Sequence, residues 1–332
     1  MCYSLYLKGN YMHSFSTSLW AHISLFVTAL LSTSLLTAED LSSPEAVYGQ
    51  IVDIYHPTEQ DYRLIQEYFV RGNRPFISRL RDYEPNAKNF KIIGDTPEEL
   101  PRAGVIPVNS DITDKENCLV AYSSFNKNYP RGLNRLVQFV SQSDFKGHIL
   151  YRLGGWPNTE GGSLILAHVP YAFKVSMLKE AQRLGYKRVF WLDTAVLPYV
   201  SLNTLFDMIA EKGYFVLGNS HMIGPYMDPH AAEALGIAME ETFQVPSCSA
   251  GIFGVDLTQE IGVEILDRWY AAAHLPEAFF SPRSDQNALS TILYQMGISD
   301  FVPISRMAHH KSQIKADTLL IIEREFVNEL SL

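Results

Sequence analysis

The stretch that decides the fold reads KRVFWLDTAVLPYVSLNTLF and spans residues 187–206. Residues 189–192 are all apolar, which is typical of a strand buried on both faces of a sheet. The strand ends in a carboxylate, Asp193, and residues 202–209 then show the spacing of a helix. A buried strand that delivers an acidic side chain to the edge of a sheet indicates either a ligand site or a turn that the aspartate caps.

Strand-like and helix-like segments alternate on both sides of this stretch. Short apolar runs of the strand type cover residues 118–121, 149–153, 189–192, 214–217 and 252–255, and helical periodicity covers residues 133–140, 171–184 and 202–209. Gly185 and Gly213 follow two of these helices, where a helix commonly ends. Such alternation is typical of an α/β domain with a mostly parallel central sheet and helices on both faces. We predict this fold for residues 117–332.

Residues 39–116 carry weaker patterns, and we assign them to a small N-terminal extension. Tyr62, Ile65 and Phe69 recur at helical spacing and predict one short helix. Gly104 and Pro107 lie in a stretch rich in glycine and proline, which predicts a loop there.

The first 38 residues contain an apolar segment. Residues 23–38 read ISLFVTALLSTSLLTA and carry no charge, and two acidic residues follow at once. The segment is short for a membrane span, which needs about 20 apolar residues. We predict a signal peptide for residues 1–38, with an uncleaved membrane anchor or a buried helix as alternatives. The first two place the chain outside the cytoplasm, secreted or in a periplasmic or lumenal space, with membrane contact only if the segment is uncleaved.

The composition excludes some classes of function. The chain has 27 basic and 36 acidic residues, a formal net charge of −9, which argues against a nucleic-acid backbone as partner. Its three cysteines are too few for a disulfide framework, and Cys2 could leave with the leader. No histidine or basic residue flanks Cys118 or Cys248, so we expect buried apolar side chains there rather than nucleophiles.

Several segments resemble GT-A-type glycosyltransferases, the nucleotide-diphospho-sugar transferase superfamily. They are PYAFKVSMLKEAQRLGYKRVFWLD at residues 170–193, SCSAGIFGVD at 247–256 and SDQNAL at 284–289, and the resemblance covers residues 117–311. It implies a Rossmann-like GT-A fold. It also implies a hexosyltransferase-like enzyme that moves a sugar from a nucleotide-diphosphate donor to an unknown glycan, lipid or protein acceptor.

In that family a DxD motif holds the donor ribose and a Mn²⁺ or Mg²⁺ ion on the phosphates, where the leaving group gathers negative charge. Here the motif reads Asp193-Thr194-Ala195, and Ala195 has no ligand atom, so the resemblance puts metal dependence in doubt. It implies Asp193, His309 and His310 as candidate metal ligands, with Lys311 beside the diphosphate. A solvated loop is the alternative for His309-His310-Lys311.

The resemblance also assigns the remaining site residues. Asp285 would orient or deprotonate the acceptor and Asp193 would meet the donor, so these two are the candidate catalytic residues; an N-cap is the alternative for Asp285. Lys174 would reach the nucleotide, or would be a surface lysine. The candidate donor-binding residues are Ser123, Ser124, Arg152, Lys174, Asp193, Ala250, Gly251 and Lys311.

Three rival functions remain open. A catalytically inactive exported binding protein would keep the GT-A fold without the second carboxylate. A sugar-phosphate nucleotidyltransferase would need a basic, glycine-rich loop after the first strand, which residues 122–127 do not supply. An exported hydrolase finds no support in a G-x-S-x-G, H-E-x-x-H or C-x-x-C motif.

Overall fold

The computed structural model describes residues 103–123, 129–153, 169 and 171–324. The predicted leader, the predicted helix near residue 65 and the candidate Ser124 lie outside the described residues. Within the described residues, no helix is both long and apolar enough to cross a membrane.

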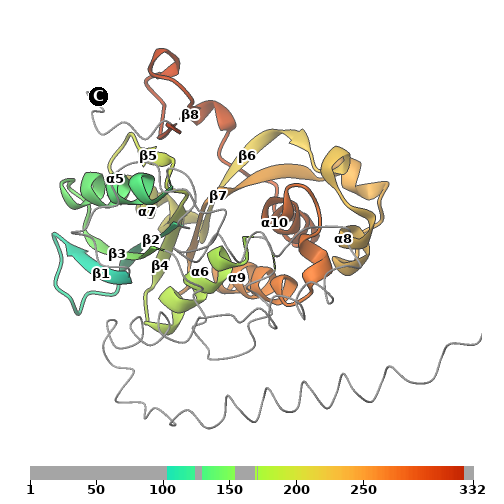
Figure 1. The fold of residues 1–332 in the computed structure, drawn as a ribbon, viewed down its shortest axis with the longest axis horizontal. Coiled ribbons are helices and arrows are strands. Elements are labelled where there is room, and N and C mark those ends of the chain that lie inside the picture. The colour runs from blue at the N-terminus through green and yellow to red at the C-terminus, as the bar shows by residue number, and fades with distance from the viewer. Residues whose placement is uncertain (1–102, 124–128, 154–168, 170, 325–332) are drawn as a thin grey trace, which may run out of the picture. The chain divides into compact units, whose positions relative to one another are not determined.

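A six-stranded sheet in the order β1-β3-β2-β4-β7-β6 forms the centre (Figure 1). Its strands are β1 (Ala103–Val108), β2 (Asn117–Ser123), β3 (Gly147–Leu153), β4 (Arg188–Leu192), β6 (Tyr214–Met222) and β7 (Pro246–Asp256). Strands β3, β2 and β4 are parallel neighbours, whereas β1 is antiparallel to β3, and β7 is antiparallel to both β4 and β6. Strand β6 therefore points the same way as β4, and the predicted mostly parallel α/β sheet is confirmed.

Strand β1 corrects the prediction of a loop around Gly104 and Pro107, because both residues lie within it. Among the described strands it pairs with β3 alone, at the edge of the sheet. Proline lacks a backbone N–H and is tolerated on an edge strand, where one side of the backbone needs no partner. The sheet thus includes a strand from the segment assigned to the N-terminal extension.

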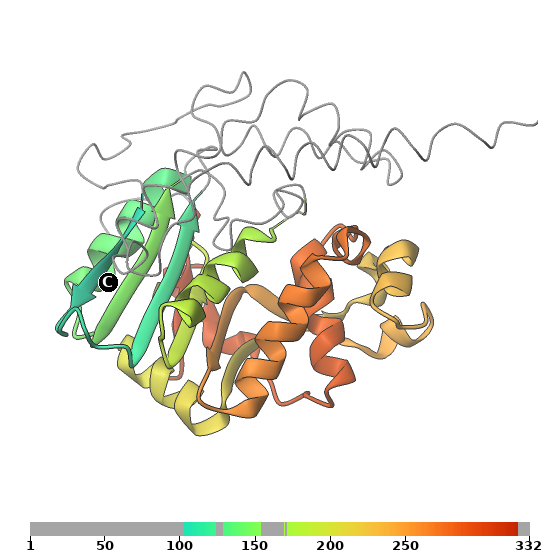
Figure 2. The same ribbon diagram turned by 90° about the horizontal axis from the view of Figure 1, so that it is seen from below.

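Helices cover both faces of the sheet. They are α5 (Tyr129–Ser141), α6 (Phe173–Arg183), α7 (Leu202–Lys212), α8 (Pro229–Ala234), α9 (Glu260–Ala273) and α10 (Ser284–Gln295). Side chains of α5 and α7 pack on one face, and those of α6, α9 and α10 pack on the other. Figure 1 shows α5 and α7 on the opposite side of the strands from α6 and α9, and Figure 2 views the side that carries α6 and α9 from below.

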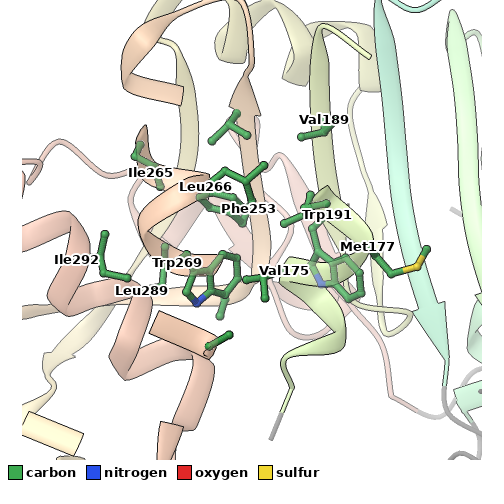
Figure 3. Close-up of a cluster of buried hydrophobic side chains, with 14 of the residues drawn as sticks. Val175, Met177, Val189, Trp191, Phe253, Ile265, Leu266, Trp269, Leu289 and Ile292 are labelled. Atoms are coloured by element: carbon green, nitrogen blue, oxygen red, sulfur yellow. The ribbon is translucent and has the colours of Figure 1, made fainter. Parts of the chain in front are cut away.

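Strand β4 is buried on both faces, as its sequence predicts. Val189 and Trp191 point into the core under α6 and α9, while Phe190 and Leu192 point into the core under α5 and α7. Figure 3 shows Trp191 beside Met177 of α6, in the same cluster as residues from α9 and α10. Burying a large apolar side chain contributes about 1.5–3 kcal/mol. This core therefore holds α6 and α10 at fixed positions beside β4 and β7.

Two helix ends follow their sequence signals. Helix α6 ends at Arg183, and Gly185 then adopts a left-handed φ of +84°. The side chain of Ser201 accepts a hydrogen bond from the backbone N–H of Asn203 and so caps the start of α7. Gly213, also at φ +84°, ends α7, so both predicted glycine stops are confirmed.

A small second sheet has the order β5-β9-β8, and its strand β5 begins three residues after Asp193. It consists of β5 (Val196–Pro198), β9 (Leu320–Ile322) and β8 (Met307–Ala308). Short 3₁₀ helices complete the described structure: η4 (Gly224–Tyr226), η5 (Glu241–Gln244), η6 (Pro276–Phe279), η7 (Ile304–Arg306) and η8 (Lys311–Gln313).

Candidate functional site

A buried lysine joins the two acidic residues that the sequence analysis singled out. Lys174 Nζ lies 3.2 Å from Asp193 Oδ1 and 2.8 Å from Asp285 Oδ2. It also donates a hydrogen bond to the backbone carbonyl of Ala250 at 3.1 Å. These residues come from α6, the turn after β4, the first turn of α10 and β7. The fold thus gathers side chains from four separate segments around one ammonium group.

Asp193 is held in a defined position at the end of β4. Its backbone N–H donates to the carbonyl of Gly251 at 2.8 Å, and the indole Nε1 of Trp191 donates to Asp193 Oδ1 at 2.8 Å. Side chains alternate along a strand, so residues 191 and 193 share a face, and that face carries Lys174. The side chain of Asp193 is 45% exposed, whereas those of Lys174 and Asp285 are 5% and 8% exposed. Asp193 is therefore the member of the cluster that solvent reaches.

Gly251 lies against the carboxylate of Asp193. A Cβ atom added at Gly251 would come within 2.5 Å of Asp193 Oδ2, which is closer than any real contact allows. Glycine is therefore required for Asp193 to keep its present orientation. The absence of a side chain at Gly251 therefore accommodates the aspartate itself.

The cluster carries one positive and two negative formal charges. Burial alone would lower the pKa of Lys174, but the charges of Asp193 and Asp285 outweigh it, and the pKa lies above its usual value. Burial raises the pKa of Asp285, Lys174 opposes that rise, and the charge of Asp193 adds to it. Asp285 therefore takes up a proton more readily than an ordinary aspartate.

Two of the alternative interpretations are wrong. Lys174 is buried, so it is not a surface lysine. Asp285 is the second residue of α10, and the N-cap position belongs to Arg283, which makes no capping hydrogen bond through its side chain. The carboxylate of Asp285 turns to Lys174 instead. A negative charge in the first turn still interacts favourably with the helix dipole.

The remaining candidates on the first strands lie in different surroundings. Ser123 is buried at the end of β2. By the strand register it lies at the same edge of the sheet as Asp193, since Val120 pairs with Trp191. Arg152 is fully buried in β3. Burial raises the pKa of Glu180 on α6, and the positive charges of Arg183 and Arg152 oppose that rise. Arg152 thus has a partner charge inside the core.

The segment after β8 carries His309, His310 and Lys311, all exposed. Strand β8 runs parallel to β9, and the residue after β9 donates a backbone hydrogen bond to the carbonyl of Ala195 at 2.8 Å. The end of β8 and the start of β5 therefore lie at the same edge of the small sheet. His310 caps η8, since its Nδ1 accepts from the backbone N–H of Ser312.

The predicted metal ligands do not form a complete site within the described residues. Among these residues, no group of three or more His, Cys, Asp or Glu side chains is placed to hold a metal ion. Ala195 offers no ligand atom, and Oδ1 of Asp193 already faces an ammonium group and an indole N–H. A divalent ion needs several oxygen or nitrogen ligands, so the side chains gathered here would not complete its coordination by themselves.

A set of polar side chains that no sequence pattern predicted lies beside this cluster. Ser247 of β7 accepts hydrogen bonds from Asn219 of β6 at 3.1 Å and from Gln286 of α10 at 3.0 Å. Arg283, just before α10, stacks on Tyr226 and donates to His221. These residues lie on separate segments of the chain. The sequence alone does not predict that they meet, because it does not show that β6, β7 and α10 are neighbours. Trp191 was different, because strand alternation already placed it on the face of Asp193.

Comparison with known proteins gives little further guidance. No family model and no curated protein matches the chain. Among solved structures, the chain is similar to the galactosyltransferase LgtC, crystallised with donor and acceptor sugar analogues. The TM-score is 0.37 and the identity is 12%, and the match covers 63% of this chain and 87% of that one. At this level of similarity, the function has to be inferred from the side chains themselves.

Proposed function

We propose that this chain is a glycosyltransferase that moves a sugar from a nucleotide-diphosphate donor to a glycan, lipid or protein acceptor. The observation that carries the proposal is the linkage of half-exposed Asp193, at the end of a dry strand, through buried Lys174 to Asp285. In open α/β sheets, ligands bind outside the carboxyl ends of the strands, where this cluster lies. A purely structural ion pair would not need a second carboxylate open to solvent.

The chemistry divides between the two carboxylates. Asp193 would accept hydrogen bonds from hydroxyl groups of the donor, with Ser123, Ser124, Ala250, Gly251 and Lys311 as further donor contacts. The acceptor oxygen would form a bond to the anomeric carbon while the bond from that carbon to the diphosphate breaks. The acceptor proton would pass to Asp285, whose raised pKa suits a general base better than an ordinary aspartate.

Lys174 would set the charge of the site. Its ammonium group lies between the two carboxylates and reduces their mutual repulsion. It would also keep Asp285 ionised until the acceptor hydroxyl gives up its proton. It would also supply a fixed positive charge near the departing diphosphate, where preorganised charge lowers the barrier most effectively. Lys311 would add a second positive charge from the segment after β8.

A divalent ion bound together with the donor is a separate part of the proposal. Asp193, His309 and His310 would be its ligands on this chain. Adding Mn²⁺ or Mg²⁺, or removing it with EDTA, should change the rate only if further ligands from the donor complete the coordination.

The rival function is an exported binding protein without activity. It gains support from Ala195, which replaces the second acidic residue of the motif. Export itself is a proposal based on residues 1–38, and it is tested by finding the chain outside the cytoplasm after cell fractionation.

The deciding experiment measures release of nucleoside diphosphate by the full chain with a panel of nucleotide sugars. We expect Asp285→Asn to slow release by about 10²–10⁴-fold, the usual contribution of a positioned proton-transfer group. Asp193→Asn, which weakens a hydrogen bond to a charged group, should slow it by about 10–10²-fold. Asp300→Asn is the control, because that side chain is 84% exposed and pairs with Lys212 on the far end of α7. Donor binding that raises the melting temperature without any release would favour the binding protein instead.

A further inference from the structure

Among the described residues, an arginine beside the candidate site forms no ion pair with a carboxylate. The guanidinium carbon of Arg283 lies 3.9 Å from the ring centroid of Tyr226. One of its N–H groups donates to Nε2 of His221. Within the described part of the chain, no ion pair joins Arg283 to an acidic side chain, although the chain carries a net charge of −9. The guanidinium is thus positioned by an aromatic ring and a neutral acceptor.

His221 strengthens this arrangement. Burial and the nearby charge of Arg283 lower the pKa of His221, so its ring is neutral at pH 7 and Nε2 can accept a hydrogen bond from the arginine. The ring of His221 also meets Tyr226 edge-on at 5.4 Å between centroids. Stacking leaves the edge of a guanidinium free to donate, and that edge matches the two oxygens of a carboxylate or phosphate.

This group is continuous with the proposed acceptor side of the site. Arg283 precedes Asp285 by two residues, so their Cα atoms are at most about 7 Å apart. Gln286, the residue after Asp285, donates a hydrogen bond to Ser247 of β7. Ser247 lies three residues before Ala250, whose carbonyl accepts from Lys174. Tyr226 is 36% exposed, so a ligand can reach the ring that supports the guanidinium.

We propose that Arg283, positioned by Tyr226 and His221, binds an anionic group of the acceptor, a carboxylate or a phosphate. This inference rests on the proposed function in one respect, that the ligand is an acceptor whose hydroxyl meets Asp285. The charge selects sugars that carry an acid group over neutral sugars of the same shape.

The test measures binding of three matched probes to the full chain by saturation-transfer NMR and calorimetry. Methyl glucoside is neutral, methyl glucuronide carries a carboxylate, and glucose 6-phosphate carries a phosphate. At least one charged probe should bind about tenfold more tightly than the neutral one, as a charge-assisted hydrogen bond allows. The charged probe that binds more tightly identifies the source of the anionic group.

Variants make the assignment specific. Arg283→Gln should abolish the preference for charged probes, and Arg283→Lys, which keeps the charge but loses the fork, should retain part of it. Arg268→Gln is the matched control, because that exposed arginine pairs with Glu264 on α9. Thermal unfolding checks that each variant is folded.

Two results would overturn the assignment: charged and neutral probes that bind equally, including no binding of any at millimolar concentration, or a preference that survives in Arg283→Gln. Donor turnover by the unmodified chain is followed in parallel. Because probe binding needs no donor, loss of the glycosyltransferase proposal and loss of this one give different readouts.

Discussion

Replacing Lys174 with methionine removes the only positive charge that an ion pair supplies to Asp285 among the described residues. The two carboxylates then differ in what they lose. Asp193, at 45% exposure, can be rehydrated, whereas Asp285, at 8%, cannot. Removing one partner of a buried ion pair costs about 3–5 kcal/mol. Since one of the two partners keeps access to water, we expect the lower end, about 3 kcal/mol of unfolding free energy.

The loss should depend on pH in a defined direction. Without Lys174 the pKa of Asp285 in the folded protein rises further. In the unfolded chain this carboxyl has its ordinary pKa of 3.8. Above pH 3.8 the folded variant therefore keeps a proton that the unfolded chain has released. Stability is then lost as the pH rises from 3.8, by at most about 1.4 kcal/mol per pH unit for one proton. The gap between the variant and the unmodified protein should widen from acid to neutral pH.

Urea unfolding followed by tryptophan fluorescence measures this, since Trp191 and Trp269 are fully buried. Lys179→Met is the matched control on the same helix, where the ion pair with Asp267 is largely exposed on the acidic side and should be worth under about 1 kcal/mol. Adding Asp285→Asn to the Lys174 variant should restore most of the loss. A Lys174→Met protein as stable as the parent, or one with a pH-independent loss, would refute this account of the cluster.

Three further outcomes are expected. Gly251→Ala should turn the Asp193 carboxylate away from Trp191 and Lys174 and cost about 1–3 kcal/mol in urea unfolding, because its Cβ would lie 2.5 Å from Oδ2; a cost that persists in an Asp193→Ala background would contradict the clash. Burial lowers the pKa of His148, which is fully buried between Tyr186 and the carbonyl of Asp111. The unfolded chain therefore binds a proton first, and stability should fall as the pH drops through 6.5; an equal slope in His148→Gln would argue against this origin. Burial raises the pKa of Cys248 to about 12 and that of Cys118 above its usual range, so a Cys2→Ser chain should react with a thiol reagent only in denaturant; rapid labelling of the native chain would show that one of them is accessible.

The alternation of strands and helices was predictable because burial leaves a direct imprint on sequence. Residues 189–192 are apolar because β4 is covered on both faces, and Gly213 ends α7 because it adopts a left-handed backbone. Strand β1 was missed for the opposite reason. Its edge position tolerates Gly104 and Pro107, which otherwise indicate a loop.

The candidate site was predictable only in part. Asp193 stood out because an acidic residue follows a wholly apolar strand. The burial of Lys174 left no local signal, since a lysine on an amphipathic helix usually faces water. Its partners lie 19 and 111 residues further along the chain, and only the folded sheet, with α6 packed on β2 and β4 and α10 on β7, brings them together. The role of Asp285 was obscured in the same way, because an aspartate at a helix start ordinarily indicates a cap.

The last described strand also has a practical consequence. Glu323 closes β9 onto the carbonyl of Ala195, two residues beyond Asp193, and its carboxylate pairs with Arg135 on α5. Strand β9 and Glu323 therefore support the turn that carries the exposed Asp193. Truncating the chain into β9 for expression would remove that support, so a shortened version should keep the residues up to Glu323.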